Sequence, residues 1–512
     1  MNDFFDPKNI FILQLETIND VLKIKDYIPY FENMENNFLQ FANLFNFPIS
    51  IFVEKDYVDK TYRDTYYFYF SSKHFTVGKN CYRISLFEGL IEIEEFYQKS
   101  RHSNLKNAFI GTIVIKPLVN GTWGKTLIDP QKLKSNTFYV RTTEYCFLIN
   151  GVEFKINAYP FSSQDTETMT CAETSIWTML EYYGNRYSEY RSVLPSEMFA
   201  EINLSSDERA LPSRGLNYLQ KSNLLKKFGF SPRVYDRQIY KEHTKQLFHY
   251  YVESGIPLTI SLNRHSTVCI GHGQSNVDIT SVNHDYCYGI CCVDSSDLFN
   301  SYVIMDDNQY PYVIEEYDKF SLHDDCKQLL RFTVPLYKRI VLEANDAQAI
   351  FKEFFKVICS LNLFNEYIRS LGANEDNPVI ERIFLTSSRK YKNFRIYNSS
   401  NTLESSLYSN LLLPKFVWIM ELAIYSNYSQ KRIFGEFVLD ATSSRNSAYN
   451  SILLFRIGEY FSYRFPNENL KDFMQGLTSK YAIETTAIQY INNLNFGGHN
   501  VENNQFAKFS EN

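Results

Sequence analysis

One segment constrains this chain more than any other, because it places a cysteine at the first turn of a well-signalled helix. Residues 161 to 184 read FSSQDTETMTCAETSIWTMLEYYG. Thr170 and Glu173 have the Thr-x-x-Glu spacing of a capping box, apolar residues then recur at helical spacing, and Gly184 offers a stop. The pattern predicts Cys171 at the first helical position, where free backbone N–H groups and the helix dipole favour a thiolate.

Polar residues elsewhere in the sequence offer the partners that such a cysteine needs. Gln164 precedes Cys171 by seven residues, and its amide is a candidate donor to an oxyanion formed beside the sulfur. His265 stands at the mouth of a short strand-like run, and Asp306 ends a later one. This order suits a Cys-His-Asp acyl-transfer site, in which imidazole takes the thiol proton and the carboxylate orients the ring.

Other residues compete for the base and carboxylate roles. His272 and His284 are alternatives to His265, although the glycines that flank His272 favour a turn. Strand alternation points Asp306 and Asp307 to opposite faces but does not choose between them. Asp294 is a third candidate carboxylate, and capping or turn roles are the simpler explanation for all three.

The cysteines also allow simpler explanations. A buried cysteine is more often a small core residue than a nucleophile. Cys287, Cys291 and Cys292 with His284 are residue types that bind zinc, but an adjacent Cys pair in an apolar strand favours buried thiols. The sequence has neither a Gly-rich phosphate loop nor a His-Glu-x-x-His motif, so no cofactor and no metal are expected.

Composition excludes several classes of protein. The 52 Lys and Arg and 58 Asp and Glu residues are interspersed, with net charge −6 and no basic block, which argues against a nucleic-acid partner. No run approaches the about 18 apolar residues of a membrane span. The acidic N-terminus lacks signal-peptide features, and an odd number of cysteines, 9, is typical of reduced thiols, so a cytoplasmic location is expected.

A length of 512 residues predicts several domains. Strand-like runs at 61–72, 80–89, 108–124 and 137–161 predict an N-terminal α/β domain over 1–150. We expect a catalytic domain over 151–335, a C-terminal α/β domain over 336–494 and a flexible tail over 495–512. In the C-terminal domain, Asp440, Trp418 and Glu421 are candidates for a second polar site, with strand-end capping and core packing as the favoured roles.

The motifs together resemble those of a known family. QDTETMTCAETSIWTMLEYYG, then GIPLTISLNRHSTVCIGHG and VIMDDNQYPY, look like the papain-like cysteine peptidases, and most like the bacterial branch related to the double-glycine leader peptidases. The resemblance covers residues 160 to 320. It differs in the spacing of Gln164, which lies seven rather than six residues before the cysteine, and in Ala172, where a Gly commonly stands.

The resemblance implies both a mechanism and residue roles. Cys171 would be the nucleophile, His265 the general base and acid, Asp306 the orienting carboxylate and Gln164 the oxyanion donor. The implied activity is hydrolysis of a peptide or isopeptide bond through an acyl-enzyme, without a metal.

We therefore predict an α+β protein with a papain-like cysteine peptidase core between N-terminal and C-terminal α/β domains. The expected function is that of an intracellular cysteine protease with a protein or peptide substrate and a regulatory protein partner, by fold-level analogy an effector in a bacterial defence system. The alternatives are a transglutaminase-like acyl transferase and a papain-fold binding or scaffold protein that has lost turnover.

Overall fold

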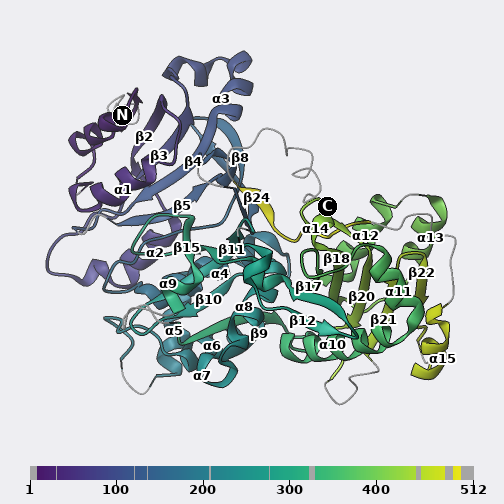
Figure 1. The fold of residues 1–512 in the computed structure, drawn as a ribbon. Coiled ribbons are helices and arrows are strands. Elements are labelled where there is room, and N and C mark those ends of the chain that lie inside the picture. Colours follow the sequence, from purple (N-terminus) through teal and green to yellow (C-terminus); the bar gives the residue numbers. More distant parts are fainter. Residues whose placement is uncertain are drawn as a thin grey trace.

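The fold comes from a computed structural model of the chain. It describes residues 9–29, 31–119, 122–134, 137–206, 209–275, 277–321, 329–399, 401–444, 451–466, 468–478 and 488–497. Three large, mostly antiparallel sheets with helices on their faces form the molecule (Figure 1). The predicted fold class, α+β, is confirmed.

The N-terminal sheet is a five-stranded antiparallel meander. Its strands follow one another in space as in sequence: β1 (Ile10–Leu15), β2 (Ile49–Tyr57), β3 (Cys81–Glu88), β4 (Phe109–Ile115) and β5 (Trp123–Ile128). Trp123 is buried against the rings of Phe38 and Phe41 and donates its Nε1–H to the Met34 sulfur at 3.0 Å. It is a core residue of this sheet.

The central sheet carries the residues of interest. Its main path runs through β15 (Val313–Glu316), β14 (Ser301–Met305), β11 (Ser266–Gly273), β10 (Leu258–Ser261), β16 (Arg331–Tyr337) and β9 (Phe230–Asp236). Off this path, β6 (Phe138–Val140) pairs with β11 and with β24 (Asn495–Gly497). A separate hairpin, β7 (Thr143–Ile149) and β8 (Val152–Ala158), follows β6 in the chain.

The C-terminal sheet has seven strands, and all but one of its pairings are antiparallel. Its order is β12 (Asp285–Cys287), β13 (Ile290–Asp294), β17 (Val379–Ser387), β18 (Phe416–Ile424), β20 (Gly435–Asp440), β21 (Ile452–Ile457) and β22 (Tyr460–Tyr463). The exception is the parallel pair of β13 and β17. A short pair, β19 (Arg432–Ile433) and β23 (Ile488–Gln489), lies beside it.

Helices separate and cover these sheets. Those of the first half are α1 (Glu35–Ala42), α2 (Lys60–Phe68), α3 (His102–Ala108), α4 (Cys171–Arg186), α5 (Pro195–Leu204), α6 (Tyr218–Lys227), α7 (Arg237–Tyr240) and α8 (His243–Glu253). Those of the second half are α9 (Tyr317–Ser321), α10 (Ala344–Ser360), α11 (Asn362–Ser370), α12 (Ser388–Tyr397), α13 (Thr402–Asn410), α14 (Tyr425–Tyr428) and α15 (Leu470–Gln475). Among the described residues, none of these helices combines the length and apolar character that a membrane crossing requires.

Two helices join the sheets through shared cores. α8 contacts both β11 of the central sheet and β17 of the C-terminal sheet, and its residues belong to one continuous apolar cluster with both. α4 also packs against β11. Its buried residues belong to a second apolar cluster, which contains N-terminal-sheet residues such as Ile51 and Ile113. Burial of apolar surface along α4 therefore ties its first turn to a rigid support.

The prediction of a strand over 61–72 is wrong. This segment forms α2 and a short 3-10 helix (Phe70–Ser72). The Asp59 carboxylate caps the helix by accepting from the Tyr62 backbone N–H at 2.7 Å, and Tyr62 and Thr65 are buried at helical rather than alternating spacing. The aromatic content of the segment favoured a strand, but the cap and the tertiary packing decide for the helix.

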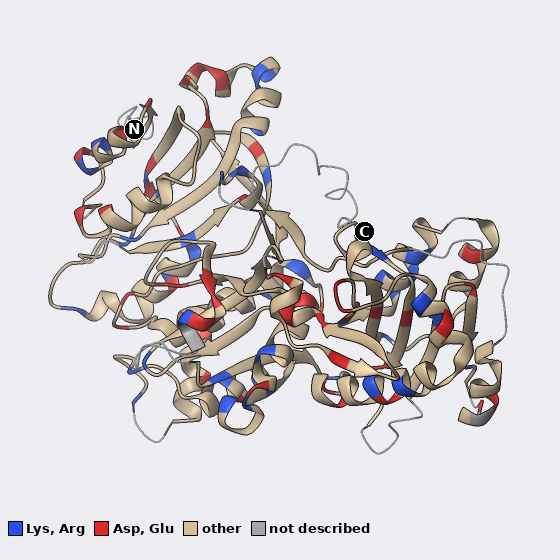
Figure 2. Ribbon diagram, in the orientation of Figure 1, with Lys and Arg blue, Asp and Glu red and all other residues tan. Residues whose placement is uncertain are grey.

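The sheets depart from the predicted domain boundaries at two places. β12 and β13 lie within the predicted catalytic domain but form one edge of the C-terminal sheet. Asn495–Gly497, the start of the predicted tail, pairs with β6 as β24, and residues 498–512 lie outside the described residues. Both differences arise because these segments form hydrogen bonds with strands that are distant in the sequence, and no local sequence pattern indicates such pairings. Basic and acidic residues are interspersed over the described ribbon (Figure 2).

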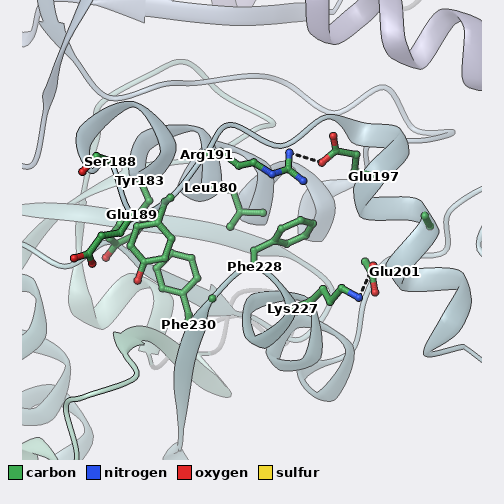
Figure 3. Close-up of a pocket in the computed structure, with 13 residues that line it drawn as sticks. Leu180, Tyr183, Ser188, Glu189, Arg191, Glu197, Glu201, Lys227, Phe228 and Phe230 are labelled. Carbon is green, nitrogen blue, oxygen red and sulfur yellow. Dashed lines mark ion pairs between the residues drawn. The ribbon is translucent and has the colours of Figure 1, made fainter.

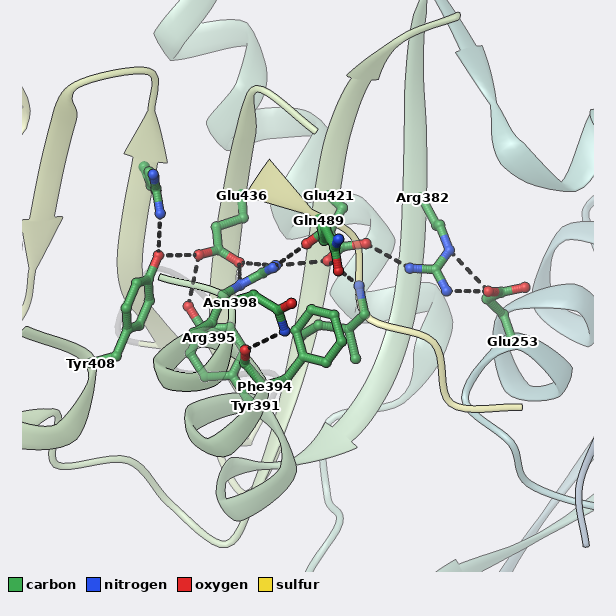
Figure 4. Close-up of polar contacts among 12 residues, drawn as sticks. Glu253, Arg382, Tyr391, Phe394, Arg395, Asn398, Tyr408, Glu421, Glu436 and Gln489 are labelled. Carbon is green, nitrogen blue, oxygen red and sulfur yellow. Dashed lines mark hydrogen bonds and ion pairs between the residues drawn. The ribbon is translucent and has the colours of Figure 1, made fainter. Parts of the chain in front are cut away.

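A chain of buried ion pairs crosses the C-terminal sheet (Figure 4). Arg382 bridges Glu253 and Glu421, and Arg395 bridges Glu421 and Glu436. These five side chains are 6% exposed or less. Charges this deep need partners, and here every Arg has two carboxylates.

The residues considered for a second polar site have structural roles. Glu421 belongs to the ion-pair chain, and Trp418 is fully buried with its Nε1–H donating to the Leu342 carbonyl at 2.9 Å. The Asp440 carboxylate accepts from the Thr442 backbone N–H at 2.7 Å and so caps the strand end. These contacts agree with the favoured expectation of capping and core packing.

Candidate active site

α4 begins at Cys171, as the helical pattern predicts. Thr170 is the N-cap, but its hydroxyl donates to the Glu173 carboxylate and accepts from no backbone N–H of the first turn, so the predicted capping box is wrong. Glu173 is fully buried and also accepts from Ser213. The helix continues to Arg186, past the predicted stop at Gly184.

Gly184 has a packing role instead of a stop role. A Cβ at this position would lie 2.3 Å from the backbone of Arg191 and Ser192. The glycine therefore lets the returning chain pass close to the helix.

A loop held by Asp165 leads the chain into Cys171. The buried Asp165 Oδ1 accepts from the backbone N–H groups of Thr168 and Met169 at 2.7 and 2.8 Å. At the other end of the first turn, the Ser175 hydroxyl bonds the carbonyls of Cys171 at 2.7 Å and Ser266 at 3.0 Å. Ser266 opens β11, so the cysteine's turn is fixed directly to the strand that follows His265.

His265 and Asp306 meet at the ends of neighbouring strands. His265 immediately precedes β11, and Asp306 immediately follows β14, which pairs with β11 in the register Val268 to Met305. His265 Nε2 lies 2.7 Å from Asp306 Oδ1. Their side chains are 18% and 13% exposed, so the pair is largely shielded from water but remains reachable.

The electrostatics of His265 link it to the cysteine. Burial alone would lower its pKa, but hydrogen bonds with Asp306 and with Cys171, together with the charges of Asp306 and Asp307, raise the pKa of His265 to about 10. Burial opposes ionisation of Asp306 as well, and the hydrogen bond and charge of His265 outweigh it and hold the pKa of Asp306 below its usual value. Since Asp306 occupies Nε2, Nδ1 is the ring nitrogen that remains for the Cys171 thiol.

Asp307 is close to the same ring but is held differently. Its Oδ1 lies 3.5 Å from His265 Nε2, and within the described structure neither carboxylate oxygen has a hydrogen-bond partner. Burial, with a contribution from the charge of Asp306, raises the pKa of Asp307 to about 7. Of the two aspartates left open by the sequence, Asp306 makes the contact that orients imidazole.

These three side chains could also hold a metal ion. One ligand atom each from His265, Asp306 and Asp307 lies within 4.8 Å of the others. A cation there would compete with Asp306 for Nε2 and would provide the partner that Asp307 lacks. The expectation of a metal-free site therefore stays a prediction and needs a chelation test.

Gln164 lies at the site, although not in the arrangement of an oxyanion donor. Its amide nitrogen donates to Asn308 Oδ1, and Asn308 Nδ2 lies 3.4 Å from His265 Nε2. The backbone N–H of Asn308 also donates to Asp306 Oδ1 at 3.0 Å. The oxyanion role of Gln164 stays a prediction: one of its two amide N–H groups bonds Asn308, and the other is available to a second acceptor.

Asn308 and Lys221 are neighbours of the site that the sequence did not indicate. Lys221 is 2% exposed and donates to the hydroxyls of Ser261 at 2.5 Å and Ser266 at 3.2 Å. Burial lowers its pKa to about 8, and the nearby Cys171 and Glu173 oppose that change. A lysine on an amphipathic helix normally faces water, so no sequence pattern indicated a place for Lys221 at the site. For Asn308, the polar Asp-Asp-Asn-Gln turn could have indicated its place there.

The competing candidates lie elsewhere and are satisfied there. His272 is paired with Glu253 at 2.9 Å, and His284 bonds the Ile279 carbonyl at 3.1 Å. Asp294 caps a 3-10 turn by accepting from the Ser296 backbone N–H. Cys291 and Cys292 are buried strand thiols, as the simpler explanation predicted.

An open pocket of about 650 Å³ lies against the second half of α4 and not at Cys171 (Figure 3). Ion pairs of Arg191 with Glu197 at 2.7 Å and of Lys227 with Glu201 at 3.0 Å cross it. These four charged side chains already pair with one another, so none of them needs a ligand as its partner.

Comparisons with known proteins add little to this geometry. No protein family and no curated protein matches the sequence. Among solved structures, the chain has a likeness to the crystal structure of UfSP from C. elegans, with 14% identity and a TM-score of 0.21 over 34% of this chain. The chain spans 32% of the length of that protein. The relation to the double-glycine leader peptidases stays a prediction.

Proposed function

We propose that this chain is a cysteine hydrolase with a papain-like core that cleaves a peptide or isopeptide bond. One observation carries the proposal: His265 and Asp306, from the ends of two neighbouring strands, lie 2.7 Å apart, and Cys171, at the start of α4, is among the groups that raise the pKa of His265. His265 with its raised pKa would hold a proton at neutral pH, as the partner of a thiolate does.

Acylation follows from this arrangement. The proton of the Cys171 thiol rests on His265 Nδ1, and the thiolate attacks the carbonyl carbon of the scissile bond, which forms a C–S bond and an oxyanion. The C–N bond then breaks, and the leaving amine takes the proton from His265. Asp306, on Nε2, keeps the ring oriented and stabilises its charged form throughout.

Deacylation returns the site to its starting state. Water replaces the amine, His265 takes a proton from it, and the hydroxyl attacks the thioester carbon. The C–S bond breaks, which restores the Cys171 thiolate beside protonated His265, and the carboxylic acid product leaves and gives its proton to water. Hydrolysis and transfer to an amine differ only in this second acceptor, so products formed with added amine distinguish the two.

Competition between cysteines tests the proposal without a known substrate. Cys146 is exposed, whereas Cys171 is partly buried. Reactivity set by exposure would favour Cys146, and reactivity set by an activated thiolate would favour Cys171. At pH 6.5 we expect iodoacetamide to alkylate Cys171 about 10-fold faster or more, measured by peptide mass mapping over time.

Three controls sharpen this measurement. His265→Ala should remove the preference for Cys171, while Cys146→Ala should leave the Cys171 rate unchanged. Excess EDTA should also leave it unchanged, because the proposed site needs no ion at His265. Preferential labelling of Cys146 in the wild-type protein would refute the activated pair, and a large change with EDTA would favour the metal site.

The two aspartates should differ when each is changed to asparagine. We expect Asp306→Asn to slow Cys171 alkylation strongly and Asp307→Asn to change it little, because Asp306 is 2.7 Å and Asp307 3.5 Å from His265 Nε2. Asp306→Asn should also return the His265 pKa from about 10 toward 6.5, observable by NMR titration of the ring. Equal effects of the two changes would contradict the assignment.

The same pair predicts a pH dependence of stability. The pKa of His265 is raised on folding and that of Asp306 is lowered. The pair's contribution is therefore complete below pH 6.5, provided Asp306 is ionised above about pH 4, and it disappears as pH rises toward 10. Urea unfolding should show Asp306→Asn costing about 2 kcal/mol near pH 6 and much less near pH 10.

A further inference from the structure

A second cavity lies between the central and C-terminal sheets, at the end of α4 opposite Cys171. Its volume is about 440 Å³. The end of α4, the ends of β16 and β17, the first turn of α12 and the start of β18 all contribute to its lining. The volume falls within the range of cavities that bind small organic ligands.

Basic side chains dominate the charged lining of this cavity. They are Arg141, Arg186, Arg389, Lys390 and Lys415, and the acidic lining residue is Glu189. Glu189 pairs with Lys415 at 2.7 Å, where both are about half exposed. The other four cations have no carboxylate partner in the part of the chain that the structure describes. The cavity therefore has a strong net positive charge.

Some N–H donors of these cations make no hydrogen bond among the described residues, and others bond only neutral oxygens. Arg186 Nε is buried and, among the described residues, has no hydrogen-bond partner. The Lys390 ammonium likewise has none in the described ranges, and Arg141 bonds only neutral oxygens, those of Tyr182, Tyr187 and Asn493. Burial and the charges of Arg141 and Arg186 hold the pKa of Lys390 well below its usual range.

Such a cluster is costly to an empty protein. Arg141 is buried, Arg186 and Lys390 are half-buried and Arg389 is exposed, so the like charges of the first three repel one another and lose part of their hydration without a carboxylate to offset that cost. The ion-pair chain in the neighbouring sheet gives each of its arginines two carboxylates, whereas these cations have none among the described residues. Unpaired cations around a cavity are what an anionic ligand would complete.

The rest of the lining is aromatic and apolar. The rings of Tyr187 and Tyr337 lie 6.1 Å apart, and those of Tyr337 and Phe416 lie 4.9 Å apart. Leu336 and Ile340 extend this surface. Lys415 Nζ lies 5.4 Å from the centre of the Tyr337 ring and 5.6 Å from that of the Phe416 ring, so a ligand ring that packs here would displace Lys415 from these faces while an anion on the same molecule reaches the other cations.

We propose that this cavity binds a small aromatic phosphate ester of mononucleotide size. Arg186 and Lys390 would contact the phosphate, and the Tyr337 and Phe416 surface would contact the ring. The first turn of the ten-residue helix α12 adds its positive end on the same side as Lys390. The site does not depend on the hydrolysis proposed for Cys171.

Calorimetric titration of the full chain with AMP, adenosine and inorganic phosphate tests this site. We expect AMP to bind, and adenosine and phosphate each to bind at least about 10-fold more weakly, because each retains only half of the contacts. No binding of AMP at millimolar concentration would overturn the proposal. Binding of AMP no tighter than that of phosphate would refute the ring contact.

Variants separate a binding role from a structural one. Lys390→Met and Arg186→Gln should each weaken AMP binding at least about 10-fold, while Lys390→Met should raise the melting temperature of the unliganded protein because it replaces an amine that has no hydrogen-bond partner among the described residues by an apolar side chain. The control Arg191→Gln changes an arginine that is 66% exposed and already paired with Glu197, and it should leave AMP affinity unchanged. A lower melting temperature with unchanged AMP affinity in Lys390→Met would contradict the proposal.

Discussion

Alanine in place of Cys171 is expected to lower enzymatic turnover of an activated ester by about 10³-fold or more. The substitution removes the sulfur, which is the atom of the proposed site that forms a covalent bond with the carbonyl carbon of the substrate. Neither His265 nor Asp306 can replace a sulfur nucleophile in this geometry. p-Nitrophenyl acetate is a suitable probe because its acyl group is small and its leaving group needs no proton. Stopped-flow absorbance should show a burst of one p-nitrophenol per active wild-type protein and none in the variant.

His265→Ala should produce a loss of similar size, and the double variant should be no worse than either single one. Residues that act as a unit are non-additive when removed together. Mass mapping of the trapped wild-type protein should place the acetyl group on Cys171.

Cys146→Ala is the matched control for this experiment. Cys146 is exposed in the β7–β8 hairpin and pairs only with Glu144, at 3.9 Å, so its loss should leave burst and turnover unchanged. Ester cleavage that survives in Cys171→Ala at more than a tenth of the wild-type rate would show that another group is the nucleophile.

The sequence could predict the local part of this site because local rules determine it. The start of α4 at Cys171 follows from helical periodicity, and the strand positions of His265 and Asp306 follow from short apolar runs that end in polar residues. The choice between Asp306 and Asp307 could not follow from alternation. It depends on the turn in which the Asn308 backbone N–H bonds Asp306, while Asp307 is buried with no hydrogen-bond partner among the described residues.

Contacts between distant segments account for what the sequence missed. Lys221 reaches Ser266 across the site, and β13 joins β17 across a long intervening chain, with no local pattern to indicate either. The 61–72 segment shows the opposite error, since its aromatic content suggested a strand although Asp59 caps a helix. A lone Glu421 in the apolar run of β18 was the visible sign of the ion-pair chain, but its partners could not be named.

That ion-pair chain gives the largest expected change in stability. Arg395 is 2% exposed and bridges Glu421, at 2.7 Å, with Glu436, at 2.6 Å. Arg395→Met keeps much of the side-chain volume but leaves two fully buried carboxylates short of a cation. Breaking a buried pair in this way costs about 3–5 kcal/mol, because the remaining charge is neither hydrated nor paired. Urea unfolding followed by tryptophan fluorescence should report this loss, since Trp418 lies in β18 beside Glu421.

Lys356→Met is the matched control, because it also breaks a Lys or Arg pair with a glutamate. Lys356 and Glu353 are 3.4 Å apart and about 60% exposed, so water can replace the partner and the expected cost is below about 0.5 kcal/mol. Hydrogen exchange should localise the difference: Arg395→Met should speed exchange in β18 and β20, and Lys356→Met should not. Similar costs for the two variants would mean that the interior of the C-terminal sheet admits water, and that its charges are not held together by burial.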